Sequence, residues 1–305
     1  MRAKILMLAG GAGFREGLRA PEQILSAVAV AFGHSLVIRG TVSGDSAEGE
    51  LLSGSGEYDA LMAVGSREGM SSLAARMNCA YGLRRYETPA GLLDISRLKD
   101  GRQLAGALVW PVVETDTGLN KAAVAAAALA KVGRGRLLLL PPKDGDAAWK
   151  NAVSKAAMYA ALEAPPSLNP EEVLKERLNR PEDNLVILAD SRDAGLMDSL
   201  LCHLYGLGSM CYTMHAGDGL RFFTVSPEPG KLALFASLYA AAAMLETNLT
   251  LTREAECLRT ALDNVLSSGW RAREMGDFEK TLPDEDILRL VNEQIALAGE
   301  LFDRF

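Results

Sequence analysis

Residues 185–193 have the sequence Leu-Val-Ile-Leu-Ala-Asp-Ser-Arg-Asp. The first five residues are all apolar, and a short apolar run of this kind predicts a strand buried on both faces, as in a parallel sheet covered by helices. Asp190 follows the run directly, so the polar residues begin at the carboxyl end of the predicted strand. Ligands bind at this edge in open α/β sheets, which makes the residues after Ala189 a candidate site.

Similar apolar runs recur along the chain. Strands are predicted for Ile5 to Leu8, Asp59 to Val64, Leu137 to Leu140 and around Leu108. Longer stretches with helical spacing lie between them. This alternation predicts an α/β fold with a mainly parallel sheet flanked by helices.

The predicted helices are marked by their termini. A helix is predicted through residues 74–81, and another over 121–132 with Asn120 as its N-cap and Gly133 after its end. Asn169-Pro170-Glu171-Glu172 has the order of an N-cap, a first-turn proline and two acidic residues. A last helix is predicted over 284–302, after Pro283.

Composition narrows the function classes. The 305 residues include 32 Lys and Arg against 39 Asp and Glu, a net charge of -7, so nucleic acid is not expected as a partner. The four cysteines show no C-x-x-C spacing, which disfavours a zinc site or a local redox dithiol and favours a reduced, cytoplasmic setting. Neither a signal peptide nor an apolar run of ~20 residues is recognised, so secretion and membrane insertion are not expected.

The familiar catalytic motifs are not found in the sequence. Gly10 to Gly13 form a glycine-rich turn, but Glu16 stands where the dinucleotide fingerprint needs its third glycine, so a plain strand-to-helix turn explains the glycines. No G-x-x-x-x-G-K, G-x-S-x-G or H-E-x-x-H motif occurs, and the three histidines lack ligand spacing. P-loop, serine-hydrolase and zincin functions are not indicated.

Acidic residues near the predicted sheet edge are candidate metal ligands. Asp193 and Asp198 follow the strand at 185–189, and Glu171 lies in an earlier helical turn. Carboxylate oxygens suit Mg²⁺ or Mn²⁺. On a regular helix, however, positions five apart diverge by roughly 140°, so Asp193 and Asp198 would not share one face. The alternatives to metal binding are helix capping, a solvated position, or a favourable place in a first helical turn.

Short motifs spread along the chain resemble the isocitrate/isopropylmalate dehydrogenase family, the metal-dependent β-decarboxylating dehydrogenases. Residues 8–16, Leu-Ala-Gly-Gly-Ala-Gly-Phe-Arg-Glu, resemble the family's L-P-G-D-G-I-G-P-E. Residues 73–85 resemble L-R-x-x-x-x-L-(F/Y)-A-N-(L/V)-R-P, and residues 185–206 resemble V-V-T-x-N-x-x-G-D-I-x-S-D. Residues 240–246 and 269–276 resemble A-A-M-M-L-E and G-x-R-T-x-D-L-G. The matches follow the family's order over nearly the entire chain, although no motif is intact.

The resemblance implies a two-lobed, isocitrate/isopropylmalate dehydrogenase-like fold. Residues 1–79 and 206–305 would form a large split α/β lobe, and residues 80–205 a middle α/β lobe that carries the interface of a homodimer. Candidate dimer contacts are the Ala-rich face of 121–132 and the helix before Gly206. A small acidic ligand would lie in the cleft between the lobes, where the family binds its substrate.

The resemblance also implies roles for single residues. Lys143 matches the base that deprotonates the substrate hydroxyl, and Arg84 matches a substrate-binding arginine. Glu171, Asp193 and Asp198 lie at or near the metal-binding positions. NAD(P) and Mg²⁺ or Mn²⁺ are expected only if the family's activity is kept. The alternative for Lys143 is a solvated loop lysine, and for Arg84 a surface charge pair.

Departures from the family pattern predict an eroded active site. Ala74 and Val113 stand where the family has two further carboxylate-binding arginines, and Gly195 and Ser199 where it has metal-binding aspartates. The family's tyrosine acid and its H-G-S-A-P-D cofactor loop have no recognisable counterpart. We therefore predict a ligand-binding or assembly role rather than standard β-decarboxylation. The alternative is an NAD(P)- and Mg- or Mn-dependent oxidoreductase that acts on a 2-hydroxy acid with altered site geometry.

Overall fold

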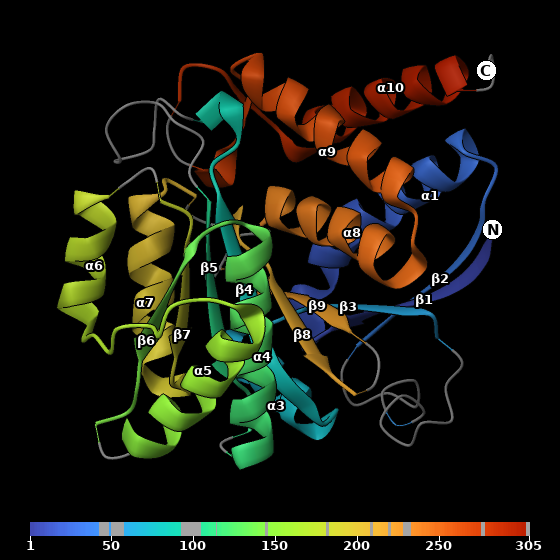
Figure 1. Ribbon diagram of the computed structural model, residues 1–305. Coiled ribbons are helices and arrows are strands. Elements are labelled where there is room, and N and C mark those ends of the chain that lie inside the picture. Colours follow the sequence, from blue (N-terminus) through green and yellow to red (C-terminus); the bar gives the residue numbers. More distant parts are fainter. Residues whose placement is uncertain are drawn as a thin grey trace. The chain divides into compact units, whose positions relative to one another are not determined.

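The computed structural model describes residues 1–42, 49, 58–92, 105–113, 115–143, 146–180, 183–207, 210–218, 221–227, 233–275 and 278–302. It has an α/β fold with a large, mostly parallel sheet (Figure 1). The chain divides into two compact units. Unit 1 comprises Met1–Met77, Tyr212–Met214 and Leu220–Phe305, and unit 2 comprises Asn78–Cys211 and His215–Gly219.

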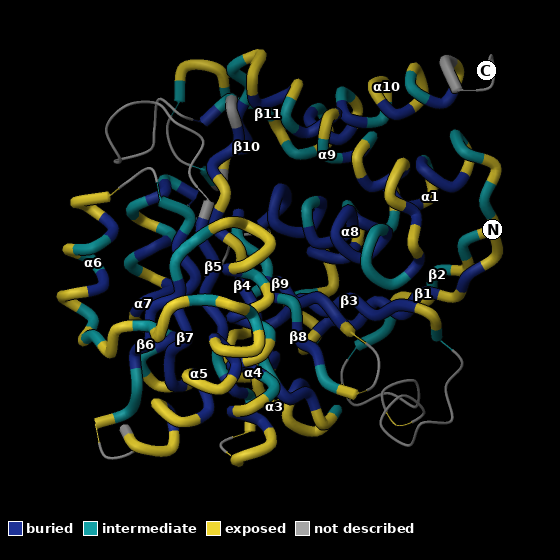
Figure 2. Tube along the Cα trace, in the orientation of Figure 1, coloured by how far each residue is buried: buried dark blue, intermediate teal, exposed yellow. Residues whose placement is uncertain are grey.

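Unit 1 is built on parallel strands in the order β2-β1-β3-β9. Their bounds are Arg2–Ala9 for β1, Ser35–Val42 for β2, Ala60–Val64 for β3 and Phe222–Val225 for β9. All residues of β3 and β9 are buried, as expected for strands covered on both faces, whereas β2 alternates between exposed and half-buried residues (Figure 2).

The α-helices in the described part of unit 1 are α1 (Arg19–Ala31), α3 (Arg67–Arg76), α8 (Leu234–Leu249), α9 (Thr252–Ser267) and α10 (Asp284–Phe302). A 3₁₀ helix, η1 (Ala12–Leu18), joins β1 to α1, and a second one, η4 (Arg273–Met275), lies near the short parallel pair β10 (Arg271–Ala272) and β11 (Thr281–Leu282). Helix α8 is apolar nearly all round and packs on β3 and β9, with α1 and α9 beside it. It is therefore the central core helix of unit 1.

Unit 2 contains the strand order β8-β4-β5-β7-β6. The bounds are Cys79–Glu87 for β4, Ala105–Pro111 for β5, Arg136–Leu140 for β6, Leu185–Ala189 for β7 and Thr213–Gly217 for β8. The division between the two units falls within β8. Strand β4 is antiparallel to β5, and β7 is parallel to both β5 and β6. The predicted strand at 185–189 therefore lies between two other strands, and all five of its residues are buried.

Helices pack on both faces of this sheet. Helices α4 (Asp116–Val132) and α5 (Asp146–Ala160) lie on one face, and α6 (Pro170–Asn179) and α7 (Ser191–Leu204) lie on the other (Figure 1). A 3₁₀ turn, η2 (Ala90–Leu92), follows β4. None of the described helices is long and apolar enough to cross a membrane.

Two of the predicted helix boundaries were wrong. The helix predicted through 74–81 ends at Arg76, because Asn78 adopts a left-handed conformation with φ of 54° and β4 begins at Cys79. The helix predicted to begin after Asn120 instead begins at Asp116, where Thr115 is the N-cap and its hydroxyl accepts a hydrogen bond from the Gly118 amide. Threonine is also a favourable N-cap residue, so an earlier start was available.

Candidate functional site

Arg84 and Asp198, two residues predicted for the site, lie together inside unit 2. Arg84 is on β4 and Asp198 is on α7. Nη1 of Arg84 lies 2.8 Å from both Oδ1 and Oδ2 of Asp198, and the side chains are only 9% and 7% exposed. The two charges are thus paired away from water rather than presented to solvent.

Three further side chains complete what we name the Arg84 cluster: Arg84, Tyr86, Asp198, Cys202 and Cys211. The Tyr86 hydroxyl donates to Asp198 Oδ1 at 2.7 Å. Cys202, one helical turn after Asp198, places its Sγ 3.6 Å from the same oxygen and 3.5 Å from the Cys211 Sγ. The Asp198 carboxylate therefore has a charged partner and two additional donors, as a buried carboxylate requires.

Local sequence explains this arrangement. Arg84 and Tyr86 are two apart on β4, so both point to the same face of the sheet, while the intervening Arg85 is exposed. Asp198 and Cys202 are four apart on α7 and share one face of the helix. Because α7 packs against the sheet near β5 and β7, the two pairs of side chains meet.

Burial and charge shift the pKa values in the cluster. Burial lowers the pKa of Arg84, but the Asp198 carboxylate together with Tyr86, Cys211 and Cys202 outweighs this effect, so the net shift is upward and Arg84 is charged. Burial, with the Asp198 charge, raises the pKa of Tyr86 well above its usual value. Nearby His215, on β8, has its pKa lowered to about 3 by burial and by the Arg84 charge, so its imidazole is neutral at pH 7.

The remaining predicted ligands do not join Asp198. Asp193 is half-buried near the start of α7, where its amide donates to the Asp190 carboxylate that caps the helix. Glu171 is exposed in the first turn of α6 and pairs with Lys175 at 2.7 Å. Among the described residues, no group of three or more His, Cys, Asp or Glu side chains could hold a metal ion. Glu171, Asp193 and Asp198 therefore do not fit a shared Mg²⁺ or Mn²⁺ site within one chain.

Lys143, the predicted base, is exposed in the turn after β6. Its assignment as a catalytic residue stays a prediction. Five alanines of α4 are buried within unit 2, namely Ala122, Ala123, Ala126, Ala127 and Ala130, whereas Val124 and Ala128 of the same helix are exposed. The homodimer and its contacts through α4 or α7 stay predictions.

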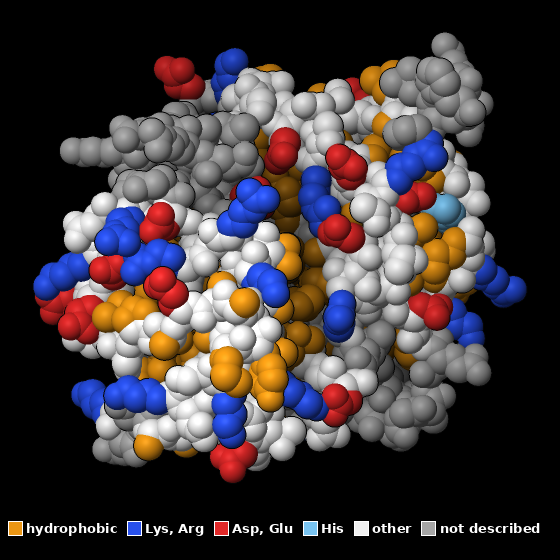
Figure 3. All heavy atoms as spheres, in the orientation of Figure 1, with side chains coloured by type: hydrophobic (Ala, Val, Ile, Leu, Met, Phe, Trp, Pro, Cys, Tyr) orange, Lys and Arg blue, Asp and Glu red, His pale blue; other side chains and the backbone are white. Residues whose placement is uncertain are grey.

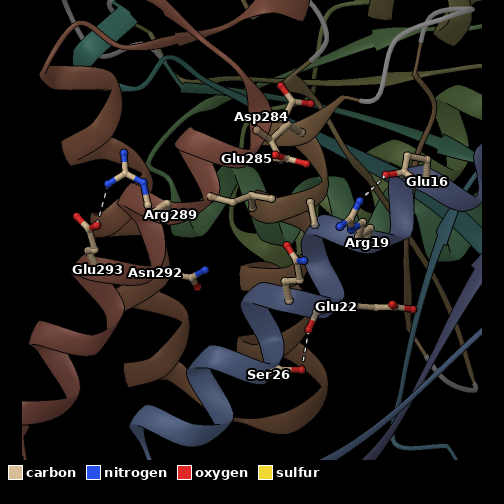
Figure 4. Close-up of a pocket in the computed structure, with 14 residues that line it drawn as sticks. Glu16, Arg19, Glu22, Ser26, Asp284, Glu285, Arg289, Asn292 and Glu293 are labelled. Carbon is tan, nitrogen blue, oxygen red and sulfur yellow. Dashed lines mark hydrogen bonds and ion pairs between the residues drawn. The ribbon is translucent and has the colours of Figure 1, made fainter.

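A cavity of about 1020 Å³ lies within unit 1 between α1 and α10 (Figure 4). Arg19, Glu22 and Ser26 line it from α1, and Arg289 and Asn292 line it from α10. Its other polar lining residues are Glu16, Gln23, Asp284, Glu285 and Glu293. The lining thus contains five carboxylates and two guanidinium groups, which disfavours an anionic ligand.

Both guanidinium groups of this cavity already have carboxylate partners. Arg19 pairs with Glu16 at 3.4 Å, and Arg289 pairs with Glu293 at 3.0 Å. Burial raises the pKa of Glu22, and the charge of Arg15 offsets part of this shift. Burial likewise raises the pKa of Asp284, and the charge of Arg273 offsets part of it. The cavity therefore has an excess of negative charge that is partly shielded from water.

Surface charge shows no basic track on the face drawn in Figure 3. Lys and Arg side chains alternate there with Asp and Glu among the described residues. This mixed pattern offers no continuous positive groove for a phosphate backbone on that face.

Several elements of these sites were not expected from the sequence. Tyr86 was missed because the segment before it was predicted as a helix, and only the last residues of β4, from Arg84 to Glu87, alternate between buried and exposed positions. The contact between Cys202 and Cys211 was missed because their separation matches no local motif. The cavity in unit 1 joins segments far apart in sequence, so no local pattern reveals it.

Comparisons with known proteins give a likeness of fold. No protein-family model matches the chain, and no curated protein matches it. Among solved structures, an isocitrate dehydrogenase from Methylococcus capsulatus has a TM-score of 0.78 at 13% identity, covering 96% of this chain and 99% of that one. The TT0538 protein from Thermus thermophilus also has a TM-score of 0.78, at 16% identity, covering 95% of this chain and 68% of that one. These likenesses show a remote dehydrogenase-like fold.

Proposed function

We propose that this protein uses a dehydrogenase-like fold for ligand binding and does not catalyse metal-dependent β-decarboxylation. One observation carries the proposal: Arg84 and Asp198, which the resemblance assigns to substrate and metal, neutralise each other inside unit 2. A paired guanidinium is not available for a substrate carboxylate. A paired aspartate is likewise not available for a divalent cation.

The energy of the ion pair supports this conclusion. Removing one partner of a buried pair is strongly unfavourable, typically by about 3–5 kcal/mol, because a buried charge then lacks compensation. A substrate that drew Arg84 away from Asp198 would have to offset this term. Mg²⁺ or Mn²⁺ would also need several converging oxygens, which Glu171, Asp193 and Asp198 do not provide.

The cavity of unit 1 has room for a small molecule, and its volume of about 1020 Å³ is close to that of known ligand sites. Its excess of carboxylates favours positively charged compounds over a hydroxy-acid dianion. Binding there would differ in charge from the small acidic ligand that the resemblance implies. The two expectations therefore lead to opposite results in a ligand screen.

A thermal-shift screen tests the proposal, because a ligand bound by the native state raises the melting temperature. Panels of isocitrate, isopropylmalate, malate and tartrate with Mn²⁺ and either nicotinamide cofactor should leave the melting temperature unchanged. Among small amines, a compound bound in the cavity should raise it, and Glu22→Gln should reduce that rise while the exposed Glu171→Gln should not. A saturable rise with a hydroxy acid that depends on Mn²⁺ would overturn the proposal.

A further inference from the structure

Two cysteines that are separated in the sequence lie in contact in unit 2. Cys202 is in the last turn of α7, and Cys211 lies just before β8, outside any helix or strand. Their sulfur atoms are 3.5 Å apart. A disulfide has an S–S length of about 2.05 Å, so the two sulfurs need to approach by about 1.5 Å. Rotation of the Cys202 side chain with a small shift of the irregular segment at Cys211 could supply this movement.

The other two cysteines have different surroundings. Cys79 is buried at the start of β4 and only 2% exposed, so an oxidant in solution does not reach it, and burial raises its pKa to about 12. Cys257 is half-buried on α9 of unit 1, whereas Cys202 and Cys211 both belong to unit 2. Cys202 and Cys211 are both only half-buried, which gives a small oxidant access to the pair.

We propose that Cys202 and Cys211 form a reversible disulfide that a hydroperoxide oxidises. In the first step, one thiol sulfur attacks a peroxide oxygen and becomes a sulfenic acid, while the O–O bond breaks and water or an alcohol leaves. In the second step, the other thiol attacks that sulfur, the S–S bond forms and water leaves. The two thiols lose two electrons and two protons in total, and the peroxide is reduced. A dithiol reductant reverses the bond by exchange.

The hydrogen bond between the two thiols divides their roles. The Cys202 hydrogen bond raises the pKa of Cys211, with burial adding to the shift, so Cys211 is held as a thiol in contact with Cys202, and Cys202 is the sulfur that attacks the peroxide. Oxidation removes one thiol donor from Asp198, but Arg84 and Tyr86 still satisfy its carboxylate. The bond can therefore form without leaving a buried charge unpaired.

The disulfide would link the end of α7 to the segment that leads into β8. A disulfide removes conformational freedom chiefly from the unfolded chain, and the stabilisation is modest when the closed loop is short. We expect the oxidised protein to melt roughly 5 °C higher than the reduced protein. This stabilisation is a property of unit 2 and does not depend on the proposed ligand-binding function.

Peptide mapping of the full-length wild-type protein tests the proposal. After treatment with hydrogen peroxide, the free thiols should fall from four to two, because one bond consumes two of them. No Lys or Arg lies between Cys202 and Cys211, so trypsin leaves both in one peptide, from Asp193 to Arg221, that should be lighter by two hydrogens. Chymotryptic cleavage after Tyr205 should then give two peptides that separate only on reduction.

Variants provide a second measurement. The rise in melting temperature on oxidation should vanish in Cys211→Ser and persist in the matched control Cys257→Ser. If Cys211→Ser does not fold, the wild-type mapping still gives the answer. Four alkylatable thiols after oxidation, a bond to Cys79 or Cys257, an intermolecular bond, or a sulfinic acid without the Cys202–Cys211 bond would each overturn the proposal.

Discussion

Arg84 on β4 and Asp198 on α7 form a buried ion pair, in which one guanidinium nitrogen lies 2.8 Å from both carboxylate oxygens. The two residues are separated by 114 positions, so the pair joins the sheet of unit 2 to a helix on its face. Tyr86 adds a hydrogen bond to the same carboxylate. The pair therefore stabilises the packing of α7 and occupies the two groups that the family resemblance assigns to substrate and metal.

Replacement of Arg84 tests how strongly the fold depends on this pair. Arg84→Met should lower the free energy of unfolding by about 3–5 kcal/mol, because Asp198 would remain buried without its counter-charge. Urea unfolding monitored by circular dichroism measures the change. The exposed neighbour Arg85 provides the control, and Arg85→Met should shift stability by less than about 0.5 kcal/mol. Equal effects of the two substitutions would contradict the buried-pair interpretation.

Tyr86→Phe removes only the hydroxyl that donates to Asp198. A hydrogen bond to a charged group contributes about 1.5–3 kcal/mol, so we expect a loss of stability in that range. Urea unfolding gives the value, and Tyr159→Phe, whose side chain is 82% exposed, should have no measurable effect. The interpretation fails if Tyr86→Phe is as stable as the wild type.

His215 should make stability depend on acid pH. Its pKa in the folded protein is lowered to about 3 from the usual 6.5, by burial and by the Arg84 charge. Because the folded pKa is the lower one, this contribution is present above pH 6.5 and is lost as the pH falls toward 3, since the unfolded chain takes up the proton. The slope from this group approaches about 1.4 kcal/mol per pH unit.

Unfolding free energies measured between pH 7 and pH 4 test the His215 prediction. His215→Gln should reduce the slope of unfolding free energy against pH by the equivalent of about one bound proton, whereas His203→Gln, at an exposed position, should retain the wild-type slope. If His215→Gln folds poorly, the imidazole titration of the wild type followed by NMR is a direct alternative. An imidazole that titrates near pH 6.5 in the folded state would refute the prediction.

The N-terminus of α6 offers a local test. The Asn169 side chain accepts from the Glu172 amide at 3.0 Å, and the Glu172 carboxylate accepts from the Asn169 amide at 2.8 Å, which together form a capping box. Asn169→Ala should therefore cost about 1 kcal/mol of unfolding free energy. Asn151→Ala, at an exposed position inside α5, is the control and should not destabilise. A smaller effect at Asn169 than at Asn151 would contradict the cap.

Local signals in the sequence predicted part of the fold. The α/β class and the buried strand at 185–189 followed from apolar runs, and the capped start of α6 followed from Asn169-Pro170. The bounds of α10 agree with the predicted 284–302, since Pro283 and the acidic first turn mark its start. Strand β4 was missed because the helical pattern of α3 was extended past Asn78, whose left-handed conformation no neighbouring residue signals.

Contacts between residues distant in the sequence could not be predicted from local sequence patterns. Arg84 and Asp198 were each predicted as binding residues, but their pairing depends on how α7 packs on the sheet. Helical geometry did indicate that Asp193 and Asp198 diverge, and the structure agrees, with Asp193 half-buried and Asp198 buried. The Cys202–Cys211 contact and the cavity between α1 and α10 depend on the tertiary fold, which local residue spacing does not predict.

Formation of NADH or NADPH by the purified protein is the most direct test of the central claim. The assay contains Mg²⁺ or Mn²⁺, either oxidised cofactor, and isocitrate, isopropylmalate, malate or tartrate in turn, with Lys143→Ala in parallel. We predict no cofactor reduction above the protein-free rate for any of the acids, and the same result for the variant. Robust turnover by the wild type that Lys143→Ala abolishes would contradict the claim, because it would show a working decarboxylating site despite the pairing of Arg84 with Asp198.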